Sequence, residues 1–155
     1  MVPRGLSHVT AIHIALGVAL IVVNFAAGAW GGWCWWRHEP AARGFWPLLR
    51  IGQALVMIEA VDGAILLAMG RELPELHLIY GLVPLGVSFM AEQLRLAAAD
   101  TVLTQRGLDG RADVEKLPEH EQRDLVVTIV HREMGVMAAS ALVVAVLGLR
   151  AAAVL

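Results

Sequence analysis

The residues with the clearest chemical potential are histidines followed by glycine four positions later, which occur as three pairs: His13 and Gly17, His77 and Gly81, His131 and Gly135. Glycine makes up 15 of the 155 residues, so six histidines would have fewer than one such partner by chance. Positions i and i+4 share a helix face, so the glycine leaves open surface beside the imidazole. Such an imidazole can ligate a metal beside a flat macrocycle. The alternative is a histidine at a membrane interface, with glycine serving helix packing.

The composition identifies the class of protein that must position these histidines. Hydrophobic residues make up 58% of the chain and charged residues 17%, against about 25% charged in soluble domains. The chain is therefore predicted to be a membrane protein whose main partner is the lipid bilayer. No basic patch with interleaved aromatics indicates nucleic-acid binding. The single cysteine, Cys34, excludes an intramolecular disulfide and a Cys-x-x-Cys redox pair.

Four apolar stretches are long enough to cross a bilayer, at about residues 8–36, 47–70, 75–99 and 124–150. Pro47 suits the first turn of the second helix, and Gly70 is a natural stop. The fold class predicted is an all-α membrane protein: one domain, an antiparallel four-transmembrane-helix bundle. Residues 100–123 are expected to project from the membrane as a cytoplasmic helical hairpin.

The basic residues predict the orientation of the bundle. Most of them flank the first and third connections, whereas Arg4, Arg71 and Arg150 lie on the other side. The positive-inside rule then places both termini outside a bacterial cytoplasmic (inner) membrane. The bacterial source is an inference from composition, because eleven of the twelve basic residues are arginine and small apolar residues dominate, as in GC-rich genomes.

In a bundle of this topology the first and third helices are diagonal partners that face each other across the core. His13 and His77 lie on those two helices, each about one turn inside the outer end. Two imidazoles at one depth, each beside a glycine, form the arrangement that a bis-histidine haem requires. The residues expected to surround that haem are Gly17, Gly81, Asn24, Tyr80 and Ser88.

At the level of architecture, these spans and histidine-glycine turns resemble the four-helix haem-binding halves of haem A synthase and the ascorbate-reducible b-type cytochromes. The resemblance implies haem b, ligated by His13 and His77, in electron transfer or haem handling near the outer leaflet. The chain departs from those families because His131 has no histidine opposite it on the second helix. A second bis-histidine haem is therefore not expected, and a single half would act alone, as a homodimer or in a larger membrane complex.

Glu59 and Asp62 lie mid-span in the second helix, where an ionised carboxylate is costly. Three roles remain open for Glu59: hydrogen-bond acceptor for a ligating imidazole, proton relay, or structural hydrogen bond between helices. The alternative overall function is accordingly non-redox. The chain would then be a small transporter that uses these carboxylates, or an accessory subunit of a larger complex.

A second polar group is expected at the cytoplasmic end of the bundle, composed of Arg50, Gln53, Glu92, His131, Arg132 and Glu133. It could bind an anionic head group, haem propionates or a quinone head, or form a charge-neutral network that closes the bundle. Within it, Arg50 is expected to pair with Glu92 at a similar depth. No nucleotide-binding loop, zinc-protease helix or nucleophile elbow occurs, and the sequence leaves open whether the protein is an enzyme.

Overall fold

The computed structural model describes residues 4–40, 43–72 and 74–154, with the side chains from residue 8 onward. The described residues contain helices and no strand, which confirms the all-α class. The elements in chain order are α1 (Arg4–Trp36), α2 (Phe45–Ala68), α3 (Glu75–Gln105), the short α4 (Arg111–Val114) and α5 (Glu119–Ala153).

Proline and glycine set the ends of the helices. Pro74 and Pro118 immediately precede α3 and α5 with extended backbone, at ψ 139° and 149°. Gly70, just after α2, and Gly107, just after α3, have φ of +83° and +67°. These left-handed conformations favour glycine and end a helix. The predicted stop at Gly70 is therefore confirmed.

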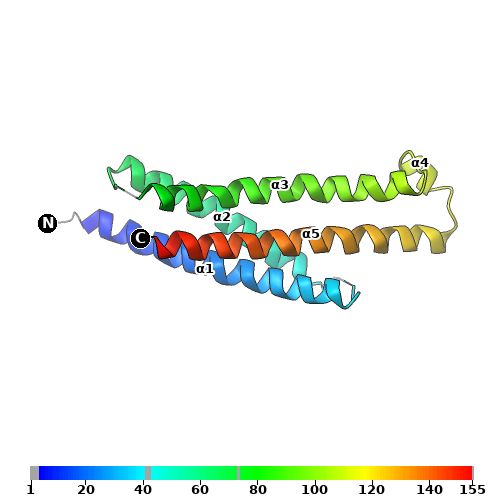
Figure 1. The fold of residues 1–155 in the computed structure, drawn as a ribbon, viewed down its shortest axis with the longest axis horizontal. Coiled ribbons are helices and arrows are strands. Elements are labelled where there is room, and N and C mark those ends of the chain that lie inside the picture. The colour runs from blue at the N-terminus through cyan, green and yellow to red at the C-terminus, as the bar shows by residue number, and fades with distance from the viewer. Residues whose placement is uncertain (1–3, 41–42, 73, 155) are drawn as a thin grey trace.

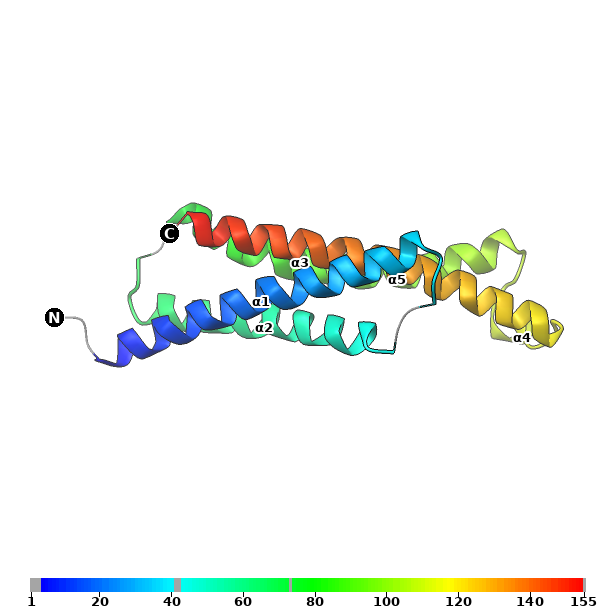
Figure 2. The ribbon, with the colours of Figure 1, turned by 90° about the horizontal axis from the view of Figure 1, so that it is seen from below.

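The four long helices run antiparallel, and both described ends of the chain lie at the same end of the molecule (Figure 1). We call this the terminus end, and the opposite end, which carries α4, the hairpin end. Helix α1 packs along α2 and α5, α3 packs along α5, and α2 meets α3 over a much smaller area. Helices α1 and α3 are thus diagonal. Beyond the α1–α2 turn, α3 and α5 continue together to α4 (Figure 2), as expected for a projecting hairpin.

Three of the four long helices are apolar and long enough to cross a membrane: His8–Trp36 within α1, Phe45–Ala68 and Glu119–Ala153. Large hydrophobic side chains such as Val18, Phe25 and Ile58 point outward and are at least half exposed. A bilayer would cover such a surface, since soluble proteins rarely expose one of this extent. The sequence predicts a fourth span in α3, but α3 also carries Glu75, Glu92, Arg95 and Asp100.

Small residues allow α1 and α5 to approach closely. A Cβ atom at Gly28 would lie 2.9 Å from the backbone carbonyl oxygen of Ala138. Ala27, Ala138 and Ala141 are buried with Met137 in the larger of the two core clusters. Close contact of this kind is how helices associate in lipid, where the hydrophobic effect between helices is weak. The tight α1–α5 pair is the frame that holds the site residues of α1 in place.

Candidate metal centre

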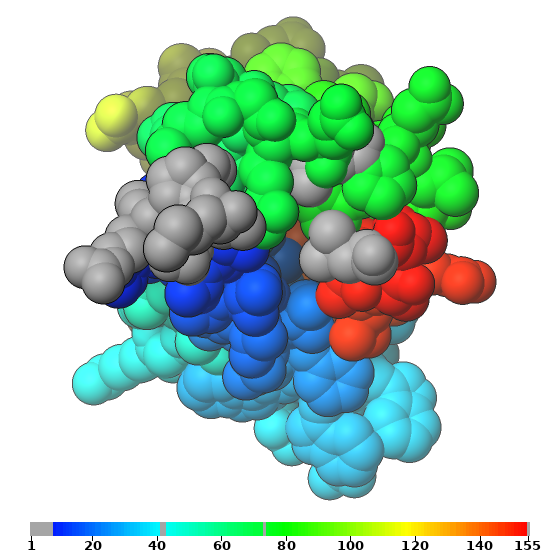
Figure 3. Space-filling view, turned by 90° about the vertical axis from the view of Figure 1, so that its left-hand side faces the viewer, coloured from blue at the N-terminus to red at the C-terminus, as the bar shows by residue number. Residues whose placement is uncertain are grey.

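The structure brings together the two histidines that the sequence places on diagonal helices. His13 of α1 and His77 of α3 have ring centroids 6.0 Å apart, with the rings edge-on at 63°. Figure 3 shows the start of α1, the end of α5 and the start of α3 together at the terminus end. His13 lies in the first third of α1 and His77 in the first turn of α3, so both belong to this end. His77 is buried and His13 is half-buried.

His13 also faces two carboxylates of α2. Its Nδ1 atom lies 3.4 Å from Oε1 of Glu59 and 3.2 Å from Oδ2 of Asp62. The exposed fractions of the three side chains are only 14 to 18%. The sequence allows three roles for Glu59: hydrogen-bond acceptor for an imidazole, proton relay, or hydrogen bond between helices. The structure places its carboxylate beside an imidazole.

The helix faces that meet here are shaped by glycine. Glu59 and Asp62 are three residues apart and so share a face of α2. On the same helix, a Cβ atom at Gly63 would lie 3.5 Å from Cε1 of His13. On α1, a Cβ atom at Gly17 would lie 3.0 Å from Oε1 of Glu59. Gly17 therefore gives room to the Glu59 carboxylate.

Three atoms of this cluster are buried without a hydrogen bond to any described residue: Nδ1 of His13, Oε2 of Glu59 and Oδ2 of Asp62. One ligand atom from each residue falls within 4.8 Å of the others. The Nδ1 atom is within ion-pair distance of the carboxylates but is not aligned for hydrogen bonding. Unpaired buried polar groups are costly and rare, so an ion or ordered water is expected among them.

The second histidine has a different partner. Nδ1 of His77 lies 2.9 Å from the backbone carbonyl oxygen of Ala151 in α5. A carbonyl oxygen only accepts, so Nδ1 of His77 carries the proton and donates it. This bond links α3 to α5 and fixes the orientation of the ring.

Two small cavities adjoin both histidines. One, of about 120 Å³, lies between α1, α3 and α5 and reaches Glu59, Gly148 and Ala151. The other, of about 80 Å³, lies between α1, α2 and α3 and includes Gly63 and Gly81. Pockets that hold drug-sized ligands are about 300–1,000 Å³. These two cavities fit an ion with a few water molecules and are too small for a haem in this arrangement of helices.

Of the residues other than Gly17 that are predicted around a haem, only Gly81 lines a cavity beside the two histidines, whereas Asn24, Tyr80 and Ser88 do not. Gly81 lines the smaller cavity, and a Cβ atom there would meet no described atom within 4 Å. Asn24 is buried and donates to the carbonyl oxygens of Leu20, at 2.9 Å, and Gly52, at 3.3 Å. Asn24 thus joins α1 to α2. Among the described residues, the linings of the two cavities include neither Tyr80 nor Ser88, which are both half-buried.

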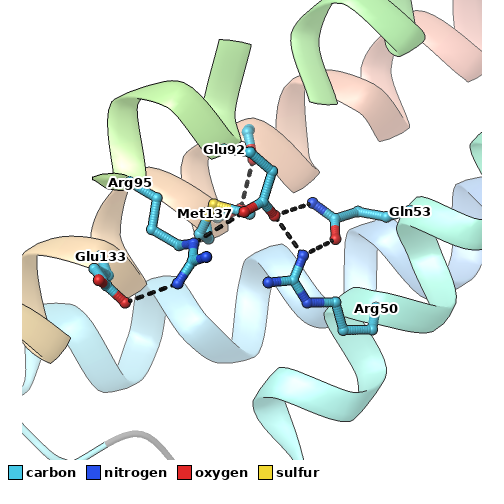
Figure 4. A network of polar contacts seen from close by, with 7 residues as sticks. Arg50, Gln53, Glu92, Arg95, Glu133 and Met137 are labelled. Carbon is cyan, nitrogen blue, oxygen red and sulfur yellow. Dashed lines mark hydrogen bonds and ion pairs between the residues drawn. The ribbon is translucent and has the colours of Figure 1, made fainter. Parts of the chain in front are cut away.

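The polar group expected at the cytoplasmic end is only partly assembled. Glu92 of α3 pairs with Arg50 of α2, as predicted, and accepts a hydrogen bond from Gln53 at 2.8 Å (Figure 4). Arg95 bridges Glu92, at 2.9 Å, to Glu133 of α5, at 3.4 Å. We call these five residues the arginine network. Arg95 is not among the residues predicted for this group, although its position three residues after Glu92 on one helix face is a usable signal.

His131 and Arg132 do not join the arginine network. Nε2 of His131 lies 2.9 Å from the carbonyl oxygen of Trp35, and the two rings stack with centroids 5.9 Å apart. The ring centroids of His38 and His131 are 4.9 Å apart. Arg132 instead donates to Gln105 at 3.2 Å. The predicted group of six is therefore divided among three places: the arginine network, His131 at the α1–α2 turn, and Arg132 beside Gln105 of α3.

Comparison with known proteins assigns no family to this arrangement. No protein-family description matches the chain, and neither the curated proteins nor the solved structures include a significant match.

Proposed function

We propose that this protein is an integral membrane protein that binds a divalent transition-metal ion at His13, Glu59 and Asp62. The observation that carries the proposal is the convergence of three buried, unsatisfied ligand atoms from α1 and α2. In a bundle with an apolar surface, two adjacent carboxylates without a cation would repel each other in a medium that screens charge poorly. A bound dication would neutralise them.

The types of ligand favour a particular group of ions. One imidazole nitrogen and two carboxylate oxygens suit Zn²⁺, Fe²⁺ and Mn²⁺, whereas Ca²⁺ and Mg²⁺ prefer oxygen alone. The adjoining cavities of about 120 and 80 Å³ have room for bound water to complete the coordination. With both termini outside, as the arginines favour, the site would lie toward the outer leaflet. The function would then be metal uptake, release or storage within the membrane.

Haem b between His13 and His77 is the second candidate. It is favoured by the 6.0 Å separation of two imidazoles on diagonal helices. It ranks below the metal ion because neither adjoining cavity accommodates a macrocycle. In addition, the carboxylate of Glu59 fills the space beside Gly17 that a haem would need. A haem would require α1 and α3 to move apart. Electron transfer belongs to this second candidate only.

The test is metal binding by the purified protein in detergent after removal of metal with EDTA. Calorimetric titration with Zn²⁺ or Mn²⁺ should give one ion per chain. The double variant Glu59→Gln with Asp62→Asn should lose more than about 100-fold in affinity, since losing an outer partner alone costs about 10–100-fold. The matched control is Glu121→Gln with Asp124→Asn, which changes a carboxylate pair of the same spacing on the exposed start of α5.

The outcomes separate the candidates. Unchanged metal binding by the control and loss by the site variant support the metal centre. Equal affinities for wild type and site variant contradict it. A Soret band in protein from haem-replete cells that is lost on replacing either His13 or His77 would favour the haem instead.

A further inference from the structure

The ring of His77 has the chemical features of a metal ligand, although it lies outside the three-residue cluster. Resting on the proposed function, we infer that Nε2 of His77 is the fourth protein ligand of the ion held by His13, Glu59 and Asp62. The site would then join four helices: α1, α2 and α3 through ligands, and α5 through the carbonyl oxygen of Ala151.

The first argument is the protonation of the ring. Because Nδ1 of His77 donates to the carbonyl oxygen of Ala151 at 2.9 Å, the neutral ring has its lone pair on Nε2. Ligating histidines almost always donate their other ring nitrogen to a carbonyl or carboxylate, which fixes the tautomer and the ring orientation. Burial of His77, at 8% exposed, further restricts the ring.

The second argument is distance. An ion about 2 Å from one nitrogen of each of two imidazoles, in tetrahedral geometry, separates the ring centroids by roughly 5 Å. The centroids of His13 and His77 are 6.0 Å apart. An approach of about 1 Å, within the range of a side-chain adjustment, therefore places both rings on one ion. The cavities on either side of the two rings leave space for that adjustment.

The third argument is the packing around the site. Contact between α2 and α3 is sparse compared with the other neighbouring pairs of helices. Glu59 and Asp62 belong to α2 and His77 belongs to α3, so an ion shared by them would bridge this weak interface. Metal binding would then draw α3 toward α2 at the terminus end and change the bundle there.

His131 provides a matched control because it also makes a 2.9 Å contact with a backbone carbonyl, that of Trp35. It lies on α5 near the α1–α2 turn, where its ring packs against Trp35 and His38. Its ring neighbours, Trp35 and His38, include none of the proposed ligands. Replacing it removes a carbonyl-bonded histidine without touching the proposed ligands.

The experiment uses Co²⁺ as the probe, added to the EDTA-treated, detergent-purified full chain. Four-coordinate Co²⁺ absorbs visible light several-fold more strongly than five- or six-coordinate Co²⁺, and the positions of its bands shift when water replaces an imidazole ligand. Wild type should bind one Co²⁺ per chain with intense bands. His77→Ala should bind at least about 10-fold more weakly, and its bands should shift because water replaces the imidazole. His131→Ala should match wild type.

A second variant covers the case in which His77→Ala does not fold. His77→Gln keeps a donor for the carbonyl oxygen of Ala151 but offers no imidazole, so it should fold and still show weaker Co²⁺ binding and shifted bands. If the folded His77 variant keeps the affinity and intense spectrum of wild type, His77 is not a ligand and the inference is overturned, while the three-residue centre stands. Absence of Co²⁺ binding by wild type would instead overturn the proposed function.

Discussion

The two polar regions inside this bundle each contain two carboxylates, but the protein supplies matching positive charges in only one of them. In the arginine network, Glu92 and Glu133 are matched by Arg50 and Arg95, so the formal charges cancel, and each carboxylate has a partner within 3.4 Å. In the cluster at the terminus end, Glu59 and Asp62 meet a single imidazole and retain unsatisfied atoms.

This difference separates a structural role from a binding role. Ion pairs that are complete within the protein hold helices together and leave no ligand atom for anything else. A cluster left with excess negative charge in an apolar environment costs stability, and proteins tolerate such a cost mainly at functional sites. Protein stability should therefore respond with opposite signs when the two regions are neutralised or broken.

The largest change is expected from breaking the arginine network. Arg95→Ala removes the partner that Glu133 has in the network and one partner of Glu92, whose side chains are 15% and 27% exposed. Breaking a buried pair costs about 3–5 kcal/mol, and partial exposure reduces this to roughly 2 kcal/mol here. Thermal unfolding in detergent, followed by circular dichroism, measures the loss.

The control for this variant is Arg132→Ala on the neighbouring α5, which removes only an exposed contact with Gln105. Its unfolding temperature should stay near that of wild type. Equal losses for Arg95→Ala and Arg132→Ala would mean that the network does not stabilise the bundle, and the contrast between the two polar regions would disappear.

The sequence predicted the helices well because their ends depend on local chemistry. Pro74, Pro118 and Gly70 act through their own backbone conformations, which need no knowledge of the partner helices. The pairing of His13 with His77 was also predictable, since short connections make alternate helices diagonal neighbours. The fourth predicted span, in α3, is not confirmed, because this helix mixes apolar and charged residues.

The contacts within the site could not be predicted to the same extent, because they depend on the rotation of each helix about its axis. The position of Glu59 beside His13 follows from close approach at Gly17 and Gly63, which periodicity alone does not reveal. The partner of His77 is a backbone carbonyl, and no side-chain pattern identifies it. For the same reason His131 was grouped with residues that it does not contact.

A smaller change of opposite sign is expected from neutralising Glu59 and Asp62 of the proposed metal centre in the absence of metal. Glu59→Gln with Asp62→Asn removes two nearby negative charges while the amides keep hydrogen-bonding capacity for His13. The metal-free variant should be more stable than metal-free wild type by about 1 kcal/mol, the typical cost of an unsatisfied buried polar group. Unfolding in EDTA tests this.

The comparison in this case is Glu133→Gln, the same chemical change within the arginine network, which should destabilise the protein because it leaves Arg95 without that partner. If both changes destabilise the metal-free protein, the carboxylates of the terminus end are structural, and the distinction between the regions is wrong.

The smallest change is expected for an ion pair outside the bundle, which calibrates the effect of burial. Asp113 of α4 accepts a hydrogen bond from Nζ of Lys116 at 2.8 Å and one from the backbone N–H of Asp109 at 3.2 Å. The hydrogen bond from Lys116 is the main reason that the pKa of the Asp113 carboxyl lies below its usual value. The pair therefore stabilises the fold at pH values above the unfolded-state pKa of Asp113. This stabilisation is lost as the pH falls through the folded-state pKa of the same carboxyl.

Lys116→Ala should raise the pKa of Asp113 toward its ordinary value, measured by NMR titration of its carboxyl carbon, yet leave the unfolding temperature at pH 7 unchanged within error. Water surrounds this pair and screens it, and holding the lysine side chain in place offsets the attraction. The arginine network is geometrically similar but lies between helices. A loss of stability for Lys116→Ala as large as that for Arg95→Ala would mean that burial does not explain the strength of the network, and the two polar regions would need another account.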